Sequence, residues 1–415
     1  MPYSEVVDMV VKHRNQIEEI AGVVTVLSCW IYFCVTTWNA WLEPFVDVGR
    51  ELYVPWQLAE GQRLYEHIAY FNGPVSPWWN SLWFKLFGAS VTTLTMVNLA
   101  LALVFTLFLY RMLAKRFGSF TGTVTSCLFI ALFIFPQLTK NNAFNYIAPY
   151  SHEMTHGIYL AMGVILALSG RRPFNTKSIQ TIVTLMGTGI CTGLVFMLKP
   201  EIFLALAAGL ILIPVTQYLT GSWKKSYPNG PFKPMLIFSS GAFLPYLCAV
   251  IYLVTYQPIG TAAANATGAW RFIFDGSVSN TTFYHFTSGF DFPFKNLGRA
   301  MMQGFFIISA LGLIYLVSWL TSFMSFQQGK KKKTPLWKPP VLIAAGILLA
   351  VPSFFFSSIH WHELSRGLPV VLAIVIVLIL LIRFKSGVTS SAREKSGKRI
   401  SDTVRHVTGL LPLVI

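Results

Sequence analysis

Long apolar runs recur along the chain, and they restrict what it can fold into. A helix needs about 20 apolar residues to cross a hydrocarbon core, and a spanning segment must satisfy its backbone hydrogen bonds internally. Of the 415 residues, 54% are hydrophobic and 12% are charged, whereas soluble domains carry about 25% charge. The sequence predicts an all-α polytopic membrane protein with about ten transmembrane helices. The predicted spans are 20–38, 91–111, 119–138, 153–170, 179–198, 202–220, 235–256, 301–324, 341–357 and 367–383.

The distribution of basic residues predicts the topology. The net charge is +16, and Lys and Arg gather in alternate connecting segments, for example the run GKKKKTPLWKPP. Cytoplasmic loops carry this excess in membrane proteins, so both termini are predicted to be cytoplasmic and no nucleic-acid partner is expected. The outer segments are then 39–90, 139–152, 199–201, 257–300 and 358–366. We expect one transmembrane domain over 1–383 and a basic cytoplasmic tail over 384–415.

The first outer segment holds an unusual concentration of polar and aromatic residues between Asp47 and Gly88. Asp47, Arg50 and Glu51 have the i, i+3, i+4 spacing that places side chains on one helix face. That face would offer a carboxylate as a general base and a guanidinium for a phosphate. The alternative is an Asp that stabilises a helix N-terminus, beside a surface ion pair. Together with the aromatic run PWWNSLWFKLFG, the segment predicts a pair of amphipathic helices on the membrane surface.

This segment resembles a known family. The pattern D-x-G-R-E, then G-x-x-L-Y, then Y-x-N-G-P-x-x-P, then a hydrophobic helix ending in F-G is similar to the first outer loop of the GT-C membrane glycosyltransferases. Relatives there include the protein O-mannosyltransferases and the lipid A aminoarabinose transferases. The resemblance is closest over 47–88, looser over the following stretch, and rests on hydropathy alone beyond Glu201.

The resemblance implies a function and a set of roles. Such enzymes transfer a sugar from a polyprenyl-phosphate donor to a lipid, glycan or protein acceptor, here on the periplasmic face of a bacterial inner membrane. Asp47 would act as the base and Arg50 would contact the donor phosphate. The family's usual Asp-Glu pair is replaced by Asp47-Val48, so Glu51 is the candidate for the second acid. An inverting displacement would need no Ser or Cys nucleophile.

Other outer segments supply further candidate residues. A phosphate leaving group needs positive charge nearby, which predicts donor contacts from Arg50, Lys85, Lys199, Arg271 and Arg366. The candidates for binding the acceptor or sugar are Tyr65, Tyr70, Tyr150, Glu153, Glu201 and His362. The alternative for Lys199 with Glu201, and for Arg366, is a charged side chain that reaches from the membrane edge to water.

Two other functions stay open. His152-Glu153-Met154-Thr155-His156 is an HExxH sequence, which on a helix can bind zinc. His152 and His156 are therefore candidate ligands of a divalent metal in an intramembrane metalloprotease, with Glu153 as its base, although no cofactor is certain. His285, Asp291 and His360 share the predicted outer side. A transporter or flippase for lipid-linked sugars should show mid-span charges and a repeat between halves, and the sequence shows neither.

Overall fold

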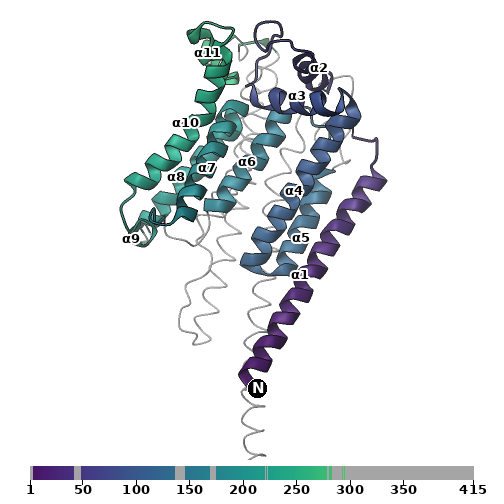
Figure 1. Ribbon diagram of the computed structural model, residues 1–415, viewed down its shortest axis with the longest axis vertical. Coiled ribbons are helices and arrows are strands. Elements are labelled where there is room, and N and C mark those ends of the chain that lie inside the picture. Colours follow the sequence, from purple (N-terminus) through teal and green to yellow (C-terminus); the bar gives the residue numbers. More distant parts are fainter. Residues whose placement is uncertain are drawn as a thin grey trace, which may run out of the picture.

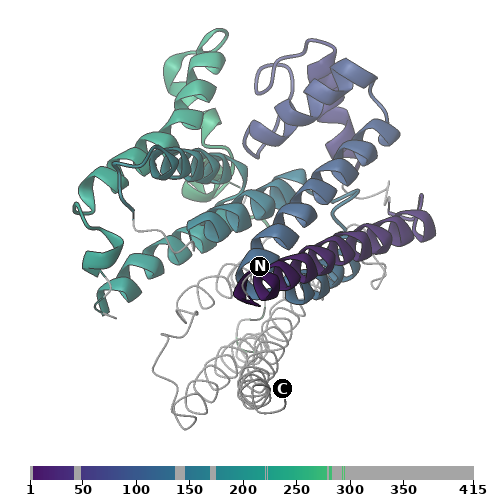
Figure 2. The ribbon, with the colours of Figure 1, turned by 60° about the horizontal axis from the view of Figure 1, so that its bottom comes forward.

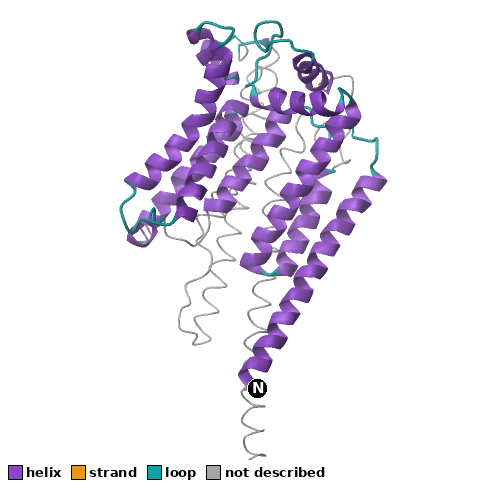
Figure 3. Ribbon diagram, in the orientation of Figure 1, coloured by secondary structure: helices purple, strands orange, loops and turns teal. Residues whose placement is uncertain are grey.

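The described part of the chain is helical. The computed structural model describes residues 3–41, 48–135, 145–168 and 174–277 apart from 220 and 222, together with 280–282, 292 and 294. These residues form helices joined by loops, with no strand among them (Figure 3). The helices are α1 (Tyr3–Thr36), α2 (Val48–Ala59), α3 (Val75–Phe87), α4 (Val91–Phe117), α5 (Ser119–Phe129), the π-helix η1 (Ile130–Ile134), α6 (His152–Leu168), α7 (Ile179–Leu198), α8 (Pro200–Leu219), α9 (Trp223–Ser226), α10 (Phe232–Val254), α11 (Ile259–Ala266) and α12 (Ala269–Asp275).

The all-α prediction is confirmed for these residues, and helices occupy each of the first seven predicted spans. Four helical segments are long and apolar enough to cross a membrane, namely 16–36, 91–115, 179–198 and 232–254. The chain thus has helices suited to an integral membrane protein. The last three predicted spans and the tail over 384–415 lie outside the described residues, so the number of ten spans stays a prediction.

Helix boundaries follow from local chemistry. Ser90 is extended and its hydroxyl accepts the Thr93 N–H at 3.0 Å, which caps the start of α4. Gly118, at φ +93°, ends that helix, in a conformation that favours glycine. Lys199 is extended between α7 and α8, and Pro200 takes the first helical position, where its missing N–H breaks no intrahelical hydrogen bond.

Small residues allow α7 and α10 to pack closely. A Cβ at Gly189 would lie 2.2 Å from the Phe238 carbonyl oxygen, and one at Gly193 would lie 2.0 Å from that of Ala242. Gly241 of α10 approaches α7 equally closely. A pair of glycines four residues apart, here Gly189 and Gly193, is typical of helix packing in membranes, where backbones must approach one another to gain dispersion contacts.

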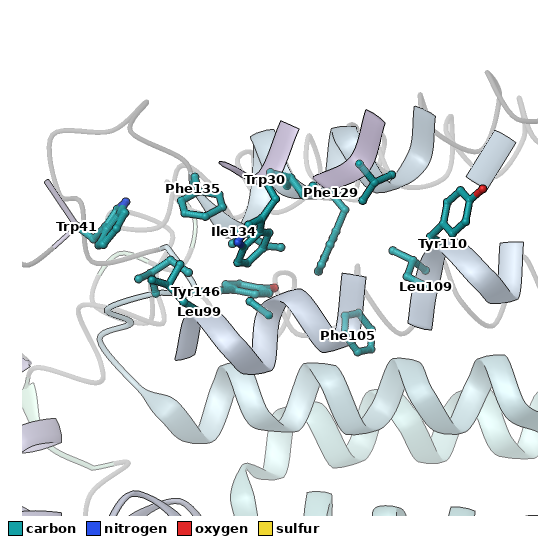
Figure 4. Close-up of a cluster of buried hydrophobic side chains, with 14 of the residues drawn as sticks. Trp30, Trp41, Leu99, Phe105, Leu109, Tyr110, Phe129, Ile134, Phe135 and Tyr146 are labelled. Atoms are coloured by element: carbon teal, nitrogen blue, oxygen red, sulfur yellow. The ribbon is translucent and has the colours of Figure 1, made fainter. Parts of the chain in front are cut away.

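A buried aromatic cluster joins the N-terminal helices. The rings of Trp30 in α1 and Phe135 after η1 meet edge to face, with centroids 5.0 Å apart, and Phe105 of α4 packs against Phe129 of α5 (Figure 4). Phe105 also packs against Tyr159 of α6. The opposite side of α6 packs against α7 and α8. Helix α6 thus lies between the α1, α4, α5 group and the α7, α8, α10 group, as two views of the molecule show (Figures 1 and 2).

The connecting segments divide between the two ends of the bundle. Helices α2, α3 and α11 lie at the end of the bundle where α4 begins, whereas α9 lies at the opposite end (Figure 1). The described parts of the predicted outer segments therefore gather at one end. The other end carries the basic pair Lys224 and Lys225 of α9 and Lys115 near the end of α4. The separation agrees with the charge pattern of the sequence, while the side of the membrane that each end faces stays a prediction.

Glycines also allow the α2–α3 connection to pack closely against the bundle. A Cβ at Gly73 would lie 1.6 Å from the Met197 carbonyl oxygen at the end of α7. On its other side, a Cβ at Gly268 would lie 2.4 Å from the Gly73 nitrogen, and Gly268 has a φ of +60°. The turn Asn72-Gly73-Pro74 therefore fits between α7 and the α11–α12 turn only because both positions lack a side chain.

Candidate functional site

Polar side chains from four segments meet at the end of the bundle that carries α2 and α3. The segments are α2 itself, the connection over 60–74, the stretch 145–153 that leads into α6, and the α7–α8 junction over 199–201. Contacts between them join residues about a hundred positions apart in sequence. We call the group of Arg50, Glu51, Tyr70, Tyr150, His152, Glu153, Lys199 and Glu201 the polar cluster.

Glu51 holds α2 against α6. Its Oε1 accepts hydrogen bonds from Arg50 Nε at 3.0 Å and Nη2 at 2.8 Å. Its Oε2 accepts the backbone N–H of His152 at 3.0 Å and is 2.6 Å from His152 Nδ1. The Glu51 side chain is only 3% exposed. Burial by itself would raise the pKa of Glu51, but the hydrogen bonds from His152 and the positive charge of Arg50 outweigh it and lower that pKa to about 2.

The hydrogen bonds of Asn98 define the protonation of His152. The Asn98 Nδ2 amino group donates to the Ile147 carbonyl oxygen at 2.9 Å, and because a carbonyl can only accept, this contact fixes the orientation of the amide. The same Nδ2 lies 2.9 Å from His152 Nε2, so Nε2 accepts and Nδ1 carries the proton that is donated to Glu51. His152 is therefore a neutral imidazole with both ring nitrogens hydrogen-bonded.

Glu153 is a second buried carboxylate. It lies in the first turn of α6, outside the four long apolar segments. The Tyr70 hydroxyl group donates a hydrogen bond to Glu153 Oε1, and the Ser151 hydroxyl group donates one to Oε2 at 2.8 Å. The oxygens of Glu153 thus accept from neutral hydroxyl groups, whereas those of Glu51 accept from a guanidinium and an imidazole.

Lys199 brings a second cation to the polar cluster. Its Nζ is 3.3 Å from Glu201 Oε1 and 5.5 Å from the centre of the Tyr150 ring. Both side chains of the ion pair are mostly buried, at 17% and 20% exposure. The Tyr150 carbonyl oxygen accepts a hydrogen bond from Arg50 Nη2 at 3.0 Å. Tyr150 therefore contacts both cations of the cluster, Arg50 and Lys199.

A cavity of about 520 Å³ opens between α2 and the 67–69 segment. Its volume lies within the range of small-molecule sites, roughly 300–1,000 Å³. Arg50 lines it, and the Nη1 atom of Arg50 makes no hydrogen bond to any described residue. Arg50 thus joins the buried Glu51 to the wall of the cavity. The lining residues are Gly49, Arg50, Tyr53, Val54, His67, Ile68 and Ala69.

The structure brings most of the described candidates together. All eight members of the polar cluster were candidates from the sequence, and Tyr65 stands beside them, where burial and the negative charge of Glu153 raise the pKa of its hydroxyl group. Lys85 does not join the cluster: it is exposed in the last turn of α3. Arg271 is exposed on α12 and donates to Asn265 Oδ1 at 3.0 Å. Asp47, Arg366 and His362 lie outside the described residues, so their roles stay predictions.

The HExxH residues are engaged by protein groups. Both ring nitrogens of His152 are hydrogen-bonded, as described above, and His156 Nδ1 lies 2.8 Å from the Ser76 hydroxyl. Glu153 is bonded to Tyr70 and Ser151. Within the described ranges, no group of three His, Cys, Asp or Glu side chains is arranged to hold a metal ion. His156 Nε2, in contrast, is buried with no hydrogen-bond partner among the described residues, and His285, most of the 283–300 stretch and His360 lie outside the described residues, so the metal site stays a prediction.

Sequence reasoning missed three residues that shape the site. Asn98 lies in an otherwise apolar run, and a lone polar residue in a span is a signal that could have found it. Tyr53 and His67 line the cavity, but nothing in the sequence distinguishes them from their neighbours. Their importance depends on the path of the 60–74 connection, which the sequence does not define.

Comparison with protein-family models, with curated proteins and with solved structures gave no match for this chain.

Proposed function

We propose that the protein is a membrane glycosyltransferase that moves a sugar from a polyprenyl-phosphate donor to a lipid, glycan or protein acceptor. The observation that carries the proposal is the cavity of about 520 Å³ with Arg50 in its wall, beside two buried carboxylates. The cavity lies at the end of the bundle where the predicted outer segments gather, as expected for an enzyme that takes its donor from the membrane and its acceptor from the outer side.

The proposed reaction is a single displacement at the anomeric carbon of the sugar. The acceptor hydroxyl loses its proton to a carboxylate as its oxygen bonds to that carbon. The bond from the carbon to the phosphate oxygen breaks, and the polyprenyl phosphate leaves with the electron pair. The positive charges of Arg50 and Lys199 would stabilise the phosphate as its negative charge increases.

The proposal gives the acidic residues different roles. The hydrogen bonds of Glu51 to described residues are to Arg50 and His152, and its side chain is buried, which suits a residue that positions α2 better than a base that must contact an acceptor. Asp47 precedes the first residue of α2 by one position, and we keep it as the proposed base. Glu153, which is buried and accepts from the Tyr70 and Ser151 hydroxyl groups, is suited to hold a proton near the acceptor.

The test measures release of polyprenyl phosphate from a panel of polyprenyl-phosphate sugars, with the full chain in nanodiscs and with either water or extracted membrane glycolipids as acceptor. We expect Asp47→Asn to lower the rate with the best donor by about 10²- to 10⁴-fold, the usual contribution of a general base. Asp275→Asn is the matched control, because Asp275 is exposed at the end of α12. If no donor releases polyprenyl phosphate, or if Asp47→Asn retains the wild-type rate, the proposed mechanism is wrong.

A further inference from the structure

The 61–68 segment forms a compact, well-bonded loop that presents His67. Tyr65 has a φ of +67°, which is uncommon for a residue with a side chain. The loop holds it there through the Tyr65 N–H, which donates to the Ile68 carbonyl oxygen at 2.9 Å. Leu64 and Ile68 are buried beneath the loop, whereas His67 is exposed and lines the cavity. The imidazole of His67 therefore has a defined place in the cavity wall.

The loop also defines the protonation of His67. The Arg63 backbone N–H donates to His67 Nδ1 at 3.2 Å, so Nδ1 acts as an acceptor and carries no proton. A neutral imidazole has one N–H group, so the proton is on Nε2. His67 thus offers a hydrogen-bond donor, rather than an acceptor, to a molecule in the cavity.

The other polar and aromatic groups of the cavity are complementary to one chemical class. Arg50 supplies a cation, and Tyr53 supplies a half-exposed aromatic ring that meets Trp56 edge to face. A sugar phosphate carries an anion, a ring with an apolar C–H face, and hydroxyl groups around its rim. Arg50 matches the phosphate, the Tyr53 ring matches the C–H face, and a single N–H from His67 matches one hydroxyl oxygen.

We propose that the cavity binds the glycosyl phosphate of the donor, with the Nε2–H of His67 donating to a sugar hydroxyl and Tyr53 packing on the sugar ring. His67 would then be a specificity-determining residue that selects the donor sugar, without taking part in the displacement. The inference rests on the proposed glycosyl transfer and assigns the part of the site that distinguishes one sugar from another.

Binding measured by calorimetry on the full chain in nanodiscs tests the assignment. The probes are citronellyl phosphate and its glucosyl, mannosyl, galactosyl and xylosyl derivatives, and the readout is the affinity of each sugar-bearing probe relative to citronellyl phosphate. Two substitutions distinguish the hydrogen bond within the loop, from the Arg63 N–H to His67 Nδ1, from the proposed hydrogen bond between His67 Nε2–H and the sugar. His67→Asn keeps an acceptor at the Nδ1 position for the Arg63 N–H, whereas His67→Gln places an amide N–H near the Nε2 position.

We expect the wild-type protein to prefer one sugar-bearing probe, and His67→Asn to reduce that preference by about 3- to 10-fold, the contribution of one neutral hydrogen bond. His67→Gln should retain most of the preference. Arg50→Ala should weaken all probes alike, because it removes the phosphate contact. Gln62→Ala, an exposed neighbour in the same loop, should behave as wild type.

The outcomes separate this inference from the proposed reaction. The assignment is overturned if the wild-type protein shows no preference for a sugar-bearing probe, or if His67→Asn keeps the full preference. If the preference depends on His67 but no donor releases polyprenyl phosphate, the sugar site stands and the proposed reaction fails. If polyprenyl phosphate is released while His67 has no effect on binding, the reaction stands and the role of His67 is wrong.

Discussion

Replacing Glu51 by Gln tests whether the polar cluster holds α2 against α6. Gln has nearly the shape of Glu, so the packing around the buried position is kept. One of its two oxygens becomes an amino group, however, which would then face either the Arg50 guanidinium or the His152 N–H groups, and both of these are donors. The substitution also removes the negative charge that balances Arg50.

The expected loss of stability is large for a substitution that, like Glu51→Gln, replaces a single heavy atom. Breaking a buried ion pair by removing one partner costs about 3–5 kcal/mol. Arg50 is 29% exposed and can turn partly towards water, so the lower end of that range, about 3 kcal/mol, applies. For a protein of 415 residues such a loss corresponds to a decrease in Tm of about 3–4 °C.

The assay is the thermal unfolding of purified variants in nanodiscs, followed by intrinsic fluorescence. Glu60→Gln is the matched control, because Glu60 follows the same helix and is exposed, and its Tm should stay within about 1 °C of wild type. A Glu51→Gln variant as stable as that control would refute the anchoring role. A variant that kept its Tm but lost glycosyl transfer would instead indicate that Glu51 takes part in the reaction.

The effect should also depend on pH. The pKa of Glu51 is lowered to about 2 in the folded state and is about 4.3 in an unfolded chain, so the unfolded state binds more protons between these values. The stabilisation is therefore complete above about pH 5 and is lost as the pH falls towards 2. The difference in Tm between wild type and Glu51→Gln should accordingly shrink between pH 6 and pH 3.5, and a constant difference would contradict the argument.

Three further predictions follow from the packing and from the cluster. Gly193→Leu should lower the Tm by about 3 °C, because its side chain would collide with the Ala242 carbonyl oxygen; unfolding in nanodiscs measures this, and an unchanged Tm would contradict the close α7–α10 contact. Lys199→Ala should lower polyprenyl-phosphate release by about 10-fold or more, whereas Lys85→Ala should leave it near wild type, and equal effects of the two would argue against the cluster. Adding EDTA should leave the Tm unchanged, because His152 has no free ring nitrogen, and a loss of stability reversed by zinc would revive the metal site.

The helices could be predicted because each of them is specified locally. An apolar run of about 20 residues must satisfy its own backbone hydrogen bonds in a membrane, and the cap at Ser90 and the start at Pro200 use side chains or ring geometry next to the boundary itself. Charge patterning similarly predicted which connections would gather at one end, because the basic residues of alternate loops obey a rule that needs no tertiary contact.

The site could be predicted only in part, because its contacts are tertiary. Helical spacing predicted that Arg50 and Glu51 would share one face, and it left open whether they belong to a functional site or form an ion pair on the surface. The partner that buries Glu51 is His152, 101 positions away, and the tautomer of that imidazole depends on Asn98 in a third helix. No local pattern contains this information, which is why His152 was considered first as a metal ligand.

Arg50 can both hold α2 in place and bind a ligand in the cavity, because different parts of its guanidinium serve the two roles. Its Nε and Nη2 atoms face the buried Glu51 and the Tyr150 carbonyl oxygen, while its side chain also lines the cavity. The carboxylate that fixes the guanidinium thereby sets the direction of the remaining donor before any ligand arrives, so less rotamer freedom is lost on binding. On this argument Glu51 contributes to phosphate recognition without touching phosphate, and Glu51→Gln should weaken citronellyl phosphate binding even at temperatures where the variant is fully folded.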